Sequence, residues 1–280
     1  MSEWILEGED LQYAYEDGTQ ALRGLSFAVR RGEKLAIMGP NGSGKSTLFL
    51  HLNGVLKPAA GRVLVNGQPV DYSRKGLLEL RRRVGIVFQD PDDQLFCADV
   101  AGEISFGLYN LGLKEEEIRR RVQDVMEELG ITPFGDKPVH ALSGGQKKRV
   151  SIADILVMEP EVLILDEPAS ALDPRHARLI DGLIDRLSER GITVILSTHD
   201  VDRALIWADR VLLLEEGRML AQGTPEEIFQ DLPLLERTNL EQPAVLKMAA
   251  ILRRQGLLPA AGAVPRRVEE LETMLQERRS

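Results

Sequence analysis

The sequence predicts an α/β protein whose central sheet is largely parallel and covered by helices on both faces. Short runs rich in Val, Ile and Leu alternate along the chain with longer segments of helical periodicity. Several of these runs are apolar almost throughout, which is typical of strands buried on both faces. Hydrophobic residues make up 43% of the 280 residues and charged residues 28%, so the chain can build a sizeable folded core.

The predicted strands differ in their patterning. Residues 4–15 and 62–70 alternate apolar and polar side chains, and this alternation predicts an antiparallel edge. Further strands are predicted at 25–29, 34–39, 83–88, 162–166, 193–197 and 210–217. The apolar runs among these are expected to form the parallel sheet.

Helical patterns define an insertion and a tail. Apolar side chains recur at three- and four-residue spacings in 114–130, namely Ile118, Val122, Val125, Met126 and Leu129. This periodicity predicts a helical subdomain at about 98–160, inserted into a main domain of residues 1–225. Thr224, with a proline after it and Glu227 three residues on, predicts the start of a mainly helical C-terminal extension over 226–280.

Charge, cysteine and histidine content exclude several classes of protein. The net charge of −9 disfavours binding to a nucleic-acid backbone, which needs clustered positive charge. One cysteine, Cys97, excludes an intrachain disulfide and fits a reducing cytoplasm. The four histidines show no metal-ligand spacing, and neither a membrane-spanning run nor a secretion signal is expected.

A glycine-rich segment predicts a phosphate site. Residues 39–46 match the pattern GxxxxGK[ST], directly follow a predicted strand and precede a helical pattern. Glycines let backbone amides approach phosphate oxygens, and the following helix directs its positive end at the same anion. Lys45 is expected to reach the β- and γ-phosphates, and Ser46 to coordinate Mg²⁺. The predicted nucleotide contacts are Gly39, Asn41, Gly42, Ser43, Gly44, Lys45, Ser46 and Thr47.

Acidic and histidine side chains follow two further strands. Asp166 ends the strand 162–166, where a carboxylate can hold Mg²⁺ through water, and Glu167 protrudes one residue further, where it can polarise an attacking water. His199 follows the strand 193–197 at the same edge and is a candidate γ-phosphate contact. The alternatives are an acidic pair that merely ends a strand and a structural histidine. The glycine-rich segment favours the functional interpretation.

An LSGGQ segment at 142–146 precedes a helical run. The chain thus carries, in this order, the glycine-rich loop, Gln89, LSGGQ, the Asp-Glu pair and His199. With this set of motifs, residues 1 to about 225 resemble the ATP-binding-cassette (ABC) ATPases. The resemblance implies a P-loop NTPase core that binds ATP and Mg²⁺ and couples ATP hydrolysis to transport. It also implies that two ATP molecules are clamped between two head-to-tail subunits. The residues that face the partner's ATP would be Ser143, Gly144, Gly145 and Gln146.

Further roles follow from the resemblance. Tyr15 is similar to the aromatic residue that stacks on adenine, with Tyr13 as the nearby alternative. Gln89 resembles the residue that senses Mg²⁺ and the attacking water and links the site to a membrane partner. Asp173 resembles the loop that contacts the other subunit. Glu167, His199 and Gln89 would then be catalytic, and Ser46, Gln89 and Asp166 would hold Mg²⁺.

One branch of the family is favoured. Residues 88–96 resemble the glutamine loop of energy-coupling-factor importers, and 235–256 resemble the C-terminal region of the cobalt-importer (CbiO-type) ATPases. The resemblance implies a transmembrane coupling subunit and a substrate-binding membrane subunit as partners, and a peripheral position on the cytoplasmic face of the membrane. Cobalt is the first expected cargo, then nickel and vitamins. The second cassette can be an identical copy or a related chain.

Other interpretations remain open. The loop after Gln89 can be an acidic surface loop, and the chain can serve an exporter or a standard importer. An ABC ATPase acting on DNA or ribosomes is disfavoured, because the segment between Ser46 and Leu142 lacks a long coiled coil and the chain holds one cassette. The tail can join two subunits or dock on its own core. Its apolar residues are Leu232, Leu234, Leu235, Val245, Leu246, Ile251 and Leu252.

Overall fold

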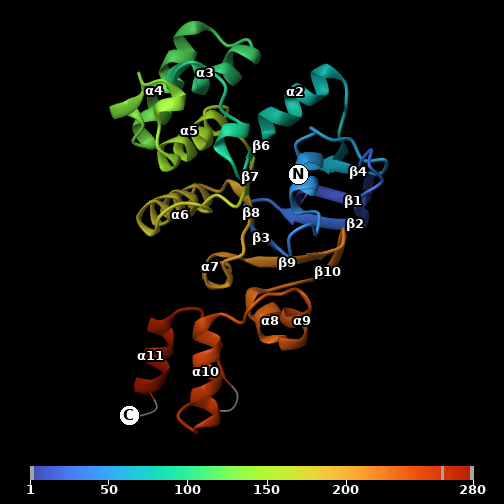
Figure 1. Cartoon of the computed structure of the whole chain (residues 1–280), viewed down its shortest axis with the longest axis vertical. Coiled ribbons are helices and arrows are strands. Elements are labelled where there is room, and N and C mark those ends of the chain that lie inside the picture. The colour runs from blue at the N-terminus through green and yellow to red at the C-terminus, as the bar shows by residue number, and fades with distance from the viewer. Residues whose placement is uncertain (1–2, 260–261, 278–280) are drawn as a thin grey trace.

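The structure of the chain is a computed structural model that describes residues 3–259 and 262–277. Within these residues a six-stranded sheet has the order β10-β9-β3-β8-β7-β6 (Figure 1). All neighbouring strands pair in parallel except β10, which pairs antiparallel with β9. The strands are β3 (Lys34–Met38), β6 (Val84–Val87), β7 (Val162–Asp166), β8 (Thr193–Ser197), β9 (Arg210–Glu215) and β10 (Arg218–Gly223). The predicted α/β fold is confirmed.

The antiparallel strands form a sheet of their own, with the order β2-β1-β4-β5. They are β1 (Trp4–Ala14), β2 (Gln20–Arg30), β4 (Ala60–Val65) and β5 (Gln68–Pro69). The predicted strand 25–29 lies within β2, where Leu25, Phe27 and Val29 alternate with more exposed residues. These three side chains share a hydrophobic core with Leu35 and Ile37 of β3. The second sheet therefore covers a face of the parallel sheet, because its own buried face needs a partner.

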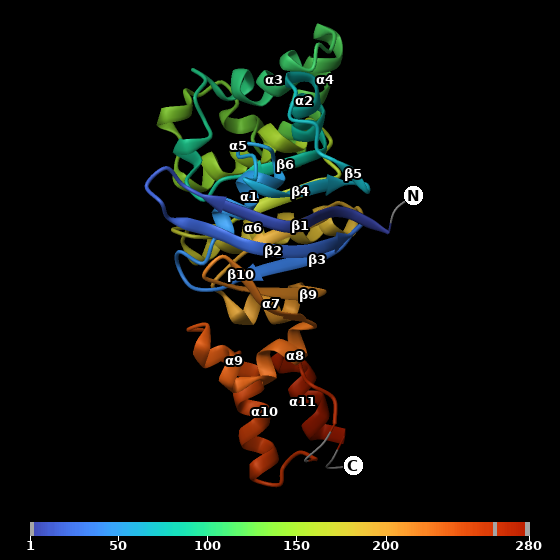
Figure 2. The ribbon, with the colours of Figure 1, turned by 90° about the vertical axis from the view of Figure 1, so that its right-hand side faces the viewer.

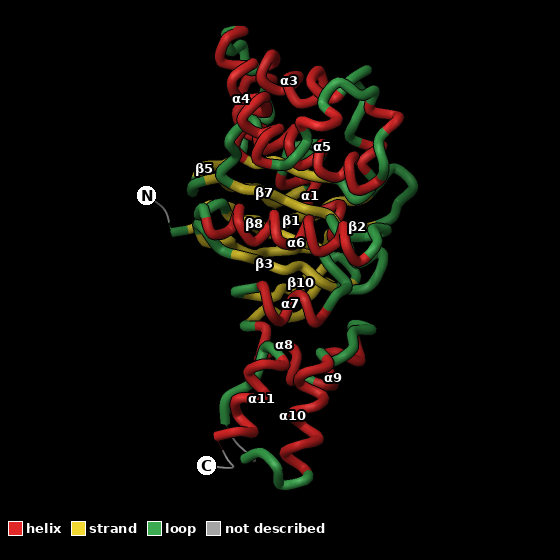
Figure 3. Tube along the Cα trace, turned by 90° about the vertical axis from the view of Figure 1, so that its left-hand side faces the viewer, coloured by secondary structure: helices red, strands yellow, loops and turns green. Residues whose placement is uncertain are grey.

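Helices complete the layers and the insertion. They are α1 (Lys45–Leu52), α2 (Arg74–Arg83), α3 (Val100–Asn110), α4 (Glu115–Glu128), α5 (Gly144–Leu156), α6 (Pro174–Glu189) and α7 (Val201–Trp207). Figure 3 shows α6 over one face of the parallel sheet, and Figure 2 shows β1 and β2 over the other. Helices α3, α4 and α5 gather at one end, and the predicted apolar face of α4 is buried through Ile118, Val122 and Val125.

The C-terminal helices lie at the opposite end of the molecule (Figure 1). They are α8 (Pro225–Gln230), α9 (Leu232–Arg237), α10 (Ala244–Arg254) and α11 (Val268–Glu277). Leu235, Val245 and Leu246 are buried within this chain, whereas Leu232 and Ile251 are about half exposed. The tail thus docks partly on its own chain. Residues 260–261 and 278–280 of the predicted extension lie outside the described residues.

No helix in the described part of the chain is both long and apolar enough to cross a bilayer.

Candidate active site

The glycine-rich loop connects β3 to the N-terminus of α1. Gly39 has a φ of 145°, and a Cβ there would lie 2.1 Å from the carbonyl oxygen of Leu214. Gly44 caps α1 with a φ of 103°, and a Cβ there would lie 2.6 Å from the carbonyl oxygen of Ala21. Only glycine fits both positions. Asn41 and Gly42 form the exposed tip, so the loop opens to solvent above the start of the helix.

Two buried polar groups lie inside this loop. The ammonium of Lys45 donates to the carbonyl oxygens of Gly39 at 2.8 Å and Pro40 at 3.0 Å, and burial lowers its pKa. An ammonium carries three N–H donors, so these bonds leave one for an anion. The Ser43 hydroxyl is buried with no hydrogen-bond partner among the described residues. A phosphate would satisfy both groups, and the loop therefore fits a nucleotide.

Ser46 and Asp166 meet at the carboxyl edge of the sheet. The Ser46 hydroxyl donates to Asp166 Oδ2 at 2.7 Å, although the two residues are 120 positions apart. The other carboxylate oxygen, Oδ1, accepts from Ser197 Oγ at 2.5 Å. A carboxylate and a hydroxyl are hard oxygen donors of the kind that Mg²⁺ prefers. The pair therefore fits the predicted Mg²⁺ position.

Glu167 lies beside two other predicted residues. Its Oε1 is 2.6 Å from Nε2 of His199, and its Oε2 is 3.5 Å from Nε2 of Gln89. Its backbone amide donates to Ser197 Oγ at 2.9 Å. Glu167 has a φ of 42°, a left-handed conformation that is rare for non-glycine residues and common at functional sites. The structure thus brings the three predicted catalytic side chains together.

The two candidate adenine contacts differ in exposure. Tyr15 is 39% exposed, and its hydroxyl hydrogen-bonds to Thr47 Oγ1 at 2.9 Å. Tyr13 packs edge-on against Tyr15 and against the buried ring of His51. Tyr15 therefore has a ring that a base could approach beside the phosphate loop, whereas Tyr13 is engaged in packing.

The signature residues begin α5. Ser143 caps the helix: its hydroxyl accepts from the Gln146 amide at 3.4 Å, and its own amide donates to Gln146 Oε1 at 2.9 Å. Ser143 and Gly144 are exposed, while Gly145 is buried against His176. Asp173 caps α6, and its carboxylate also contacts His176 Nδ1 at 2.5 Å. The signature and the predicted subunit-contact loop therefore touch each other through α6.

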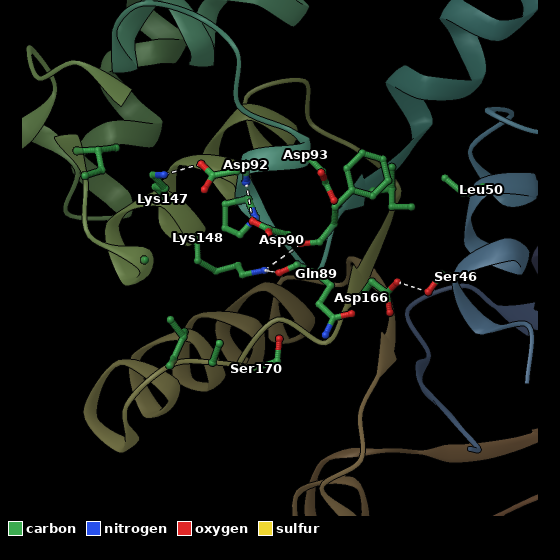
Figure 4. Close-up of a pocket in the computed structure, with 17 residues that line it drawn as sticks. Ser46, Leu50, Gln89, Asp90, Asp92, Asp93, Lys147, Lys148, Asp166 and Ser170 are labelled. Atoms are coloured by element: carbon green, nitrogen blue, oxygen red, sulfur yellow. Dashed lines mark hydrogen bonds and ion pairs between the residues drawn. The ribbon is translucent and has the colours of Figure 1, made fainter. Parts of the chain in front are cut away.

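A hollow of about 950 Å³ lies between the Ser46–Asp166 pair, the loop that carries Gln89 and the start of α5. Figure 4 shows Ser46 and Asp166 near one end, Lys147 near the other and Gln89 between them. Gly144 also lines it.

The comparisons with known proteins agree with this geometry. A family model described as ABC transporter matches residues 22–170, more than half of the chain. The chain belongs to the ABC transporter ATPases. The predicted family and the predicted ATPase activity are therefore confirmed.

Several similar proteins indicate the group of ABC ATPases to which the chain belongs. This ABC ATPase is 47% identical to the energy-coupling factor transporter ATP-binding protein EcfA of Methanocaldococcus jannaschii, over 91% of the chain and 92% of that protein. It is 50% identical to EcfA of Methanococcus maripaludis, over 91% of both. The structure of cbiO1 from Clostridium perfringens, described as part of the ABC transporter complex cbiONQ, is 47% identical, has a TM-score of 0.75, and matches over 90% of this chain and 100% of that one. The predicted energy-coupling-factor group is thus confirmed.

Another solved structure shows a nucleotide-bound cassette. The dimeric ATP-binding cassette MJ0796, bound to ADP and Pi, is 28% identical to this ABC ATPase over 79% of the chain and 99% of that one, with a TM-score of 0.72.

Sequence reasoning missed two residues of this ABC ATPase. Ser197 is fully buried and bonds to both Asp166 and the Glu167 amide. Lys148 is 1% exposed and bonds to the backbone of Gln89. Lys148 shares a helix face with Gly145 and Ile152, and a charge on such a face is a usable signal. Ser197 offers only a small polar residue at the end of an apolar strand.

Proposed function

We propose that two cassettes, this chain and an identical or related one, hold two ATP molecules between them and power a membrane importer. One observation carries the proposal: the carboxylate of Glu167 lies between His199 and Gln89, next to the Ser46–Asp166 pair and the phosphate loop. The comparison with energy-coupling factor ATP-binding proteins supports it.

The chain's own residues position the nucleotide. Loop amides and the third N–H of Lys45 bind the phosphates, while the exposed ring of Tyr15 stacks on adenine. Ser46, Asp166 and Gln89 hold Mg²⁺, which when bound neutralises phosphate charge. The contacts proposed for the loop are Gly39, Asn41, Gly42, Ser43, Gly44 and Thr47.

Glu167 is the proposed general base. Its carboxylate accepts a proton from the water that attacks the γ-phosphate, while Gln89 orients that water. His199 holds the other carboxylate oxygen and contacts the γ-phosphate. The hydrogen bond from the Glu167 backbone amide to Ser197 Oγ fixes the backbone from which the base projects.

The signature completes the partner's site. The N-terminus of α5 presents positive charge at an exposed surface through Ser143 and Gly144, which suits the γ-phosphate of the other cassette, and Gly145 and Gln146 support that turn. Shifting a dimer from 1:99 to 99:1 closed takes ~5.5 kcal/mol. Charge-assisted hydrogen bonds contribute about 1.5 to 3 kcal/mol each, so two ATP molecules supply enough. Asp173 contacts the other subunit in this arrangement.

A membrane partner docks beside the glutamine loop. Asp90, Asp92 and Asp93 line the hollow next to Gln89. Phe96 and Phe106 follow this loop in the chain, and their rings pack edge to face. The two residues are 66% and 44% exposed. Acidic and aromatic side chains together suit basic coupling helices of a transmembrane subunit. Docking there places the chain on the cytoplasmic face of the membrane as a peripheral subunit.

Cobalt is the proposed cargo, with nickel and vitamins next. The support is the 47% identity to cbiO1, the resemblance of the glutamine loop to that of energy-coupling-factor importers, and the resemblance of the tail to the cobalt-importer ATPases. The test is purification of the complex from membranes, with identification of the co-purified subunits and of any bound metal. A chain that purifies without membrane subunits contradicts the importer assignment.

The Glu167→Gln variant tests the ATPase mechanism directly. The amide cannot accept a proton, so the variant is expected to retain ATP and accumulate as a closed dimer, with hydrolysis reduced by about two orders of magnitude or more. Light scattering with ATP and Mg²⁺ measures the dimer. Turnover at the wild-type rate would refute the assignment of Glu167.

A further inference from the structure

A buried lysine joins the signature helix to the glutamine loop. Lys148, on α5, is 1% exposed, and its ammonium donates to the carbonyl oxygens of Phe88 at 2.9 Å and Gln89 at 2.7 Å (Figure 4). Burial lowers its pKa to about 8. A buried ammonium is costly unless it is hydrogen-bonded, so this contact is expected to be specific. The lysine therefore fixes both peptide groups that flank the Gln89 side chain.

A second side chain fixes the same loop from its far end. Gln94 Oε1 accepts from the Phe88 amide at 3.2 Å, and its Nε2 donates to the Ser151 carbonyl at 2.9 Å. The same Nε2 donates to Asp154 Oδ2 at 3.1 Å. Ser151 and Asp154 both belong to α5. Lys147 of the same helix also pairs with Asp92 Oδ1 at 2.5 Å, so loop 88–94 is bound to one helix at three points.

This helix spans the distance between two different sites. Its first turn carries the exposed Ser143 and Gly144, while Lys148 lies five residues beyond Ser143. At 1.5 Å per residue the separation along the axis is about 7.5 Å. The Gln89 side chain, on the loop that Lys148 holds, ends 3.5 Å from Glu167. A displacement of the signature end is therefore carried by a rigid element to the peptide that positions Gln89.

We propose that Lys148 is a positioning residue that couples the two ATP sites: when the signature engages the partner's ATP, α5 and Lys148 hold Gln89 in its position beside Glu167 at this chain's own ATP. The inference rests on the proposed function. Lys148 itself does not contact nucleotide in this proposal. The rate of ATP hydrolysis then depends on the lysine, whereas nucleotide binding and dimer formation do not.

The test is Lys148→Met in the full-length chain, since methionine keeps an apolar stem of similar length but donates no hydrogen bond. We expect kcat to fall about tenfold or more, with the Kd of a fluorescent ATP analogue within twofold of wild type. In the Glu167→Gln background, ATP-dependent dimer formation is expected to be unchanged. Lys34→Met is the matched control, because Lys34 is a half-buried lysine paired with Asp209 at the opposite edge of the sheet.

The outcomes separate the possible roles of Lys148. Hydrolysis within twofold of wild type overturns the proposal. Loss of dimer formation together with hydrolysis also overturns it, because the lysine would then only support the signature. If Lys148→Met fails to fold, Gln94→Leu removes the second attachment and must slow hydrolysis while leaving the Kd unchanged. A wild-type chain that does not hydrolyse ATP in its purified complex refutes the proposed function instead.

A double variant tests the coupling itself. If Ser143 and Lys148 act through one path, Ser143→Ala/Lys148→Met slows kcat no more than the more damaging single variant. Independent roles multiply the two losses, which gives about a hundredfold when each is about tenfold. A multiplicative loss would therefore show that α5 does not carry the signal.

Discussion

The glycine-rich loop and the signature both place glycines at a helix N-terminus, but only one of them is enclosed. At α1 the cap residue is Gly44, which has no side chain to bond the first amides, and Lys45 and Ser43 are buried behind it. At α5 the cap is Ser143, whose capping box with Gln146 already satisfies two amides, and the segment is exposed. The first site is the one that we propose binds an anion within one chain. The second is the exposed surface that we propose receives an anion from a second chain.

The long capping bond in the signature sharpens this contrast. At 3.4 Å, the Gln146 amide is held weakly by the Ser143 hydroxyl. In the arrangement proposed above, a phosphate oxygen of the partner's ATP would replace this bond at little cost, so the capping bond would not compete strongly with ATP. Four predictions test this division of roles.

The largest effect is expected at the enclosed site. Lys45→Ala removes the buried ammonium, and charge-assisted bonds of about 1.5 to 3 kcal/mol each predict a rise in the Kd for ATP of about a hundredfold. Fluorescence titration measures the affinity, with circular dichroism to check folding. Unchanged affinity would remove the loop from the nucleotide site.

The exposed site should behave differently. Ser143→Ala is expected to leave the ATP Kd of the isolated chain within twofold, because its own ATP does not touch the signature. Dimer formation in the Glu167→Gln background should need about tenfold more ATP, since one charge-assisted contact is lost per site. Analytical ultracentrifugation gives the dimer fraction. An equal loss of affinity in the monomer would place both segments at one ATP and end the contrast.

Ser197→Ala separates binding from chemistry within the enclosed site. The change leaves Asp166 Oδ1 and the part-buried Glu167 amide without their shared partner, which costs about 1 to 3 kcal/mol. We expect kcat to fall about tenfold and the Mg²⁺ concentration for half-maximal activity to rise, with little change in the ATP Kd. Ser188→Ala, which removes a hydroxyl bonded only within α6, is the control. A normal Mg²⁺ requirement would mean that Ser197 is structural.

The smallest effect concerns the pH dependence of stability on the signature side. Burial raises the pKa of Asp154 on α5 from 3.8 to about 7. Because the folded pKa lies above the unfolded one, stability is lost as the pH rises from about 4 to 7. Asp154→Asn keeps an acceptor for Gln94 and removes that loss, so its Tm should exceed that of wild type by a few degrees at pH 8 and not at pH 4. An equal difference at both pH values contradicts the raised pKa.

Sequence predicted the parts of this site that are encoded locally. Each of these parts stands at the end of a predicted strand or directly after it: the glycine-rich loop, Asp166, Glu167 and His199. Because the carboxyl ends of parallel strands meet at one edge of the sheet, predicting the strands was enough to predict that these residues lie together. Lys148 and Ser197 were missed because their roles depend on partners distant in the chain, Gln89 and Asp166, and no local pattern specifies those contacts.

The fold shows the same division. Strand positions were predicted closely, because apolar runs mark them. The pairing of β1, β2, β4 and β5 into a separate sheet depends on contacts between residues distant in the chain. The tail helices were predicted from their caps and periodicity. Which of their apolar residues are covered, Leu235 but not Leu232, depends on tertiary packing.

The backbone conformation of Glu167 bears on both the stability of the fold and the catalytic role proposed for this residue. At a φ of 42°, Gly or Asn would relax the chain, and a sequence selected only for thermal robustness would place one of them there. Keeping a glutamate at this turn sacrifices some stability for a carboxylate aimed beside His199. Efforts to make this cassette more heat-resistant should therefore leave residue 167 alone and seek their gains in the tail.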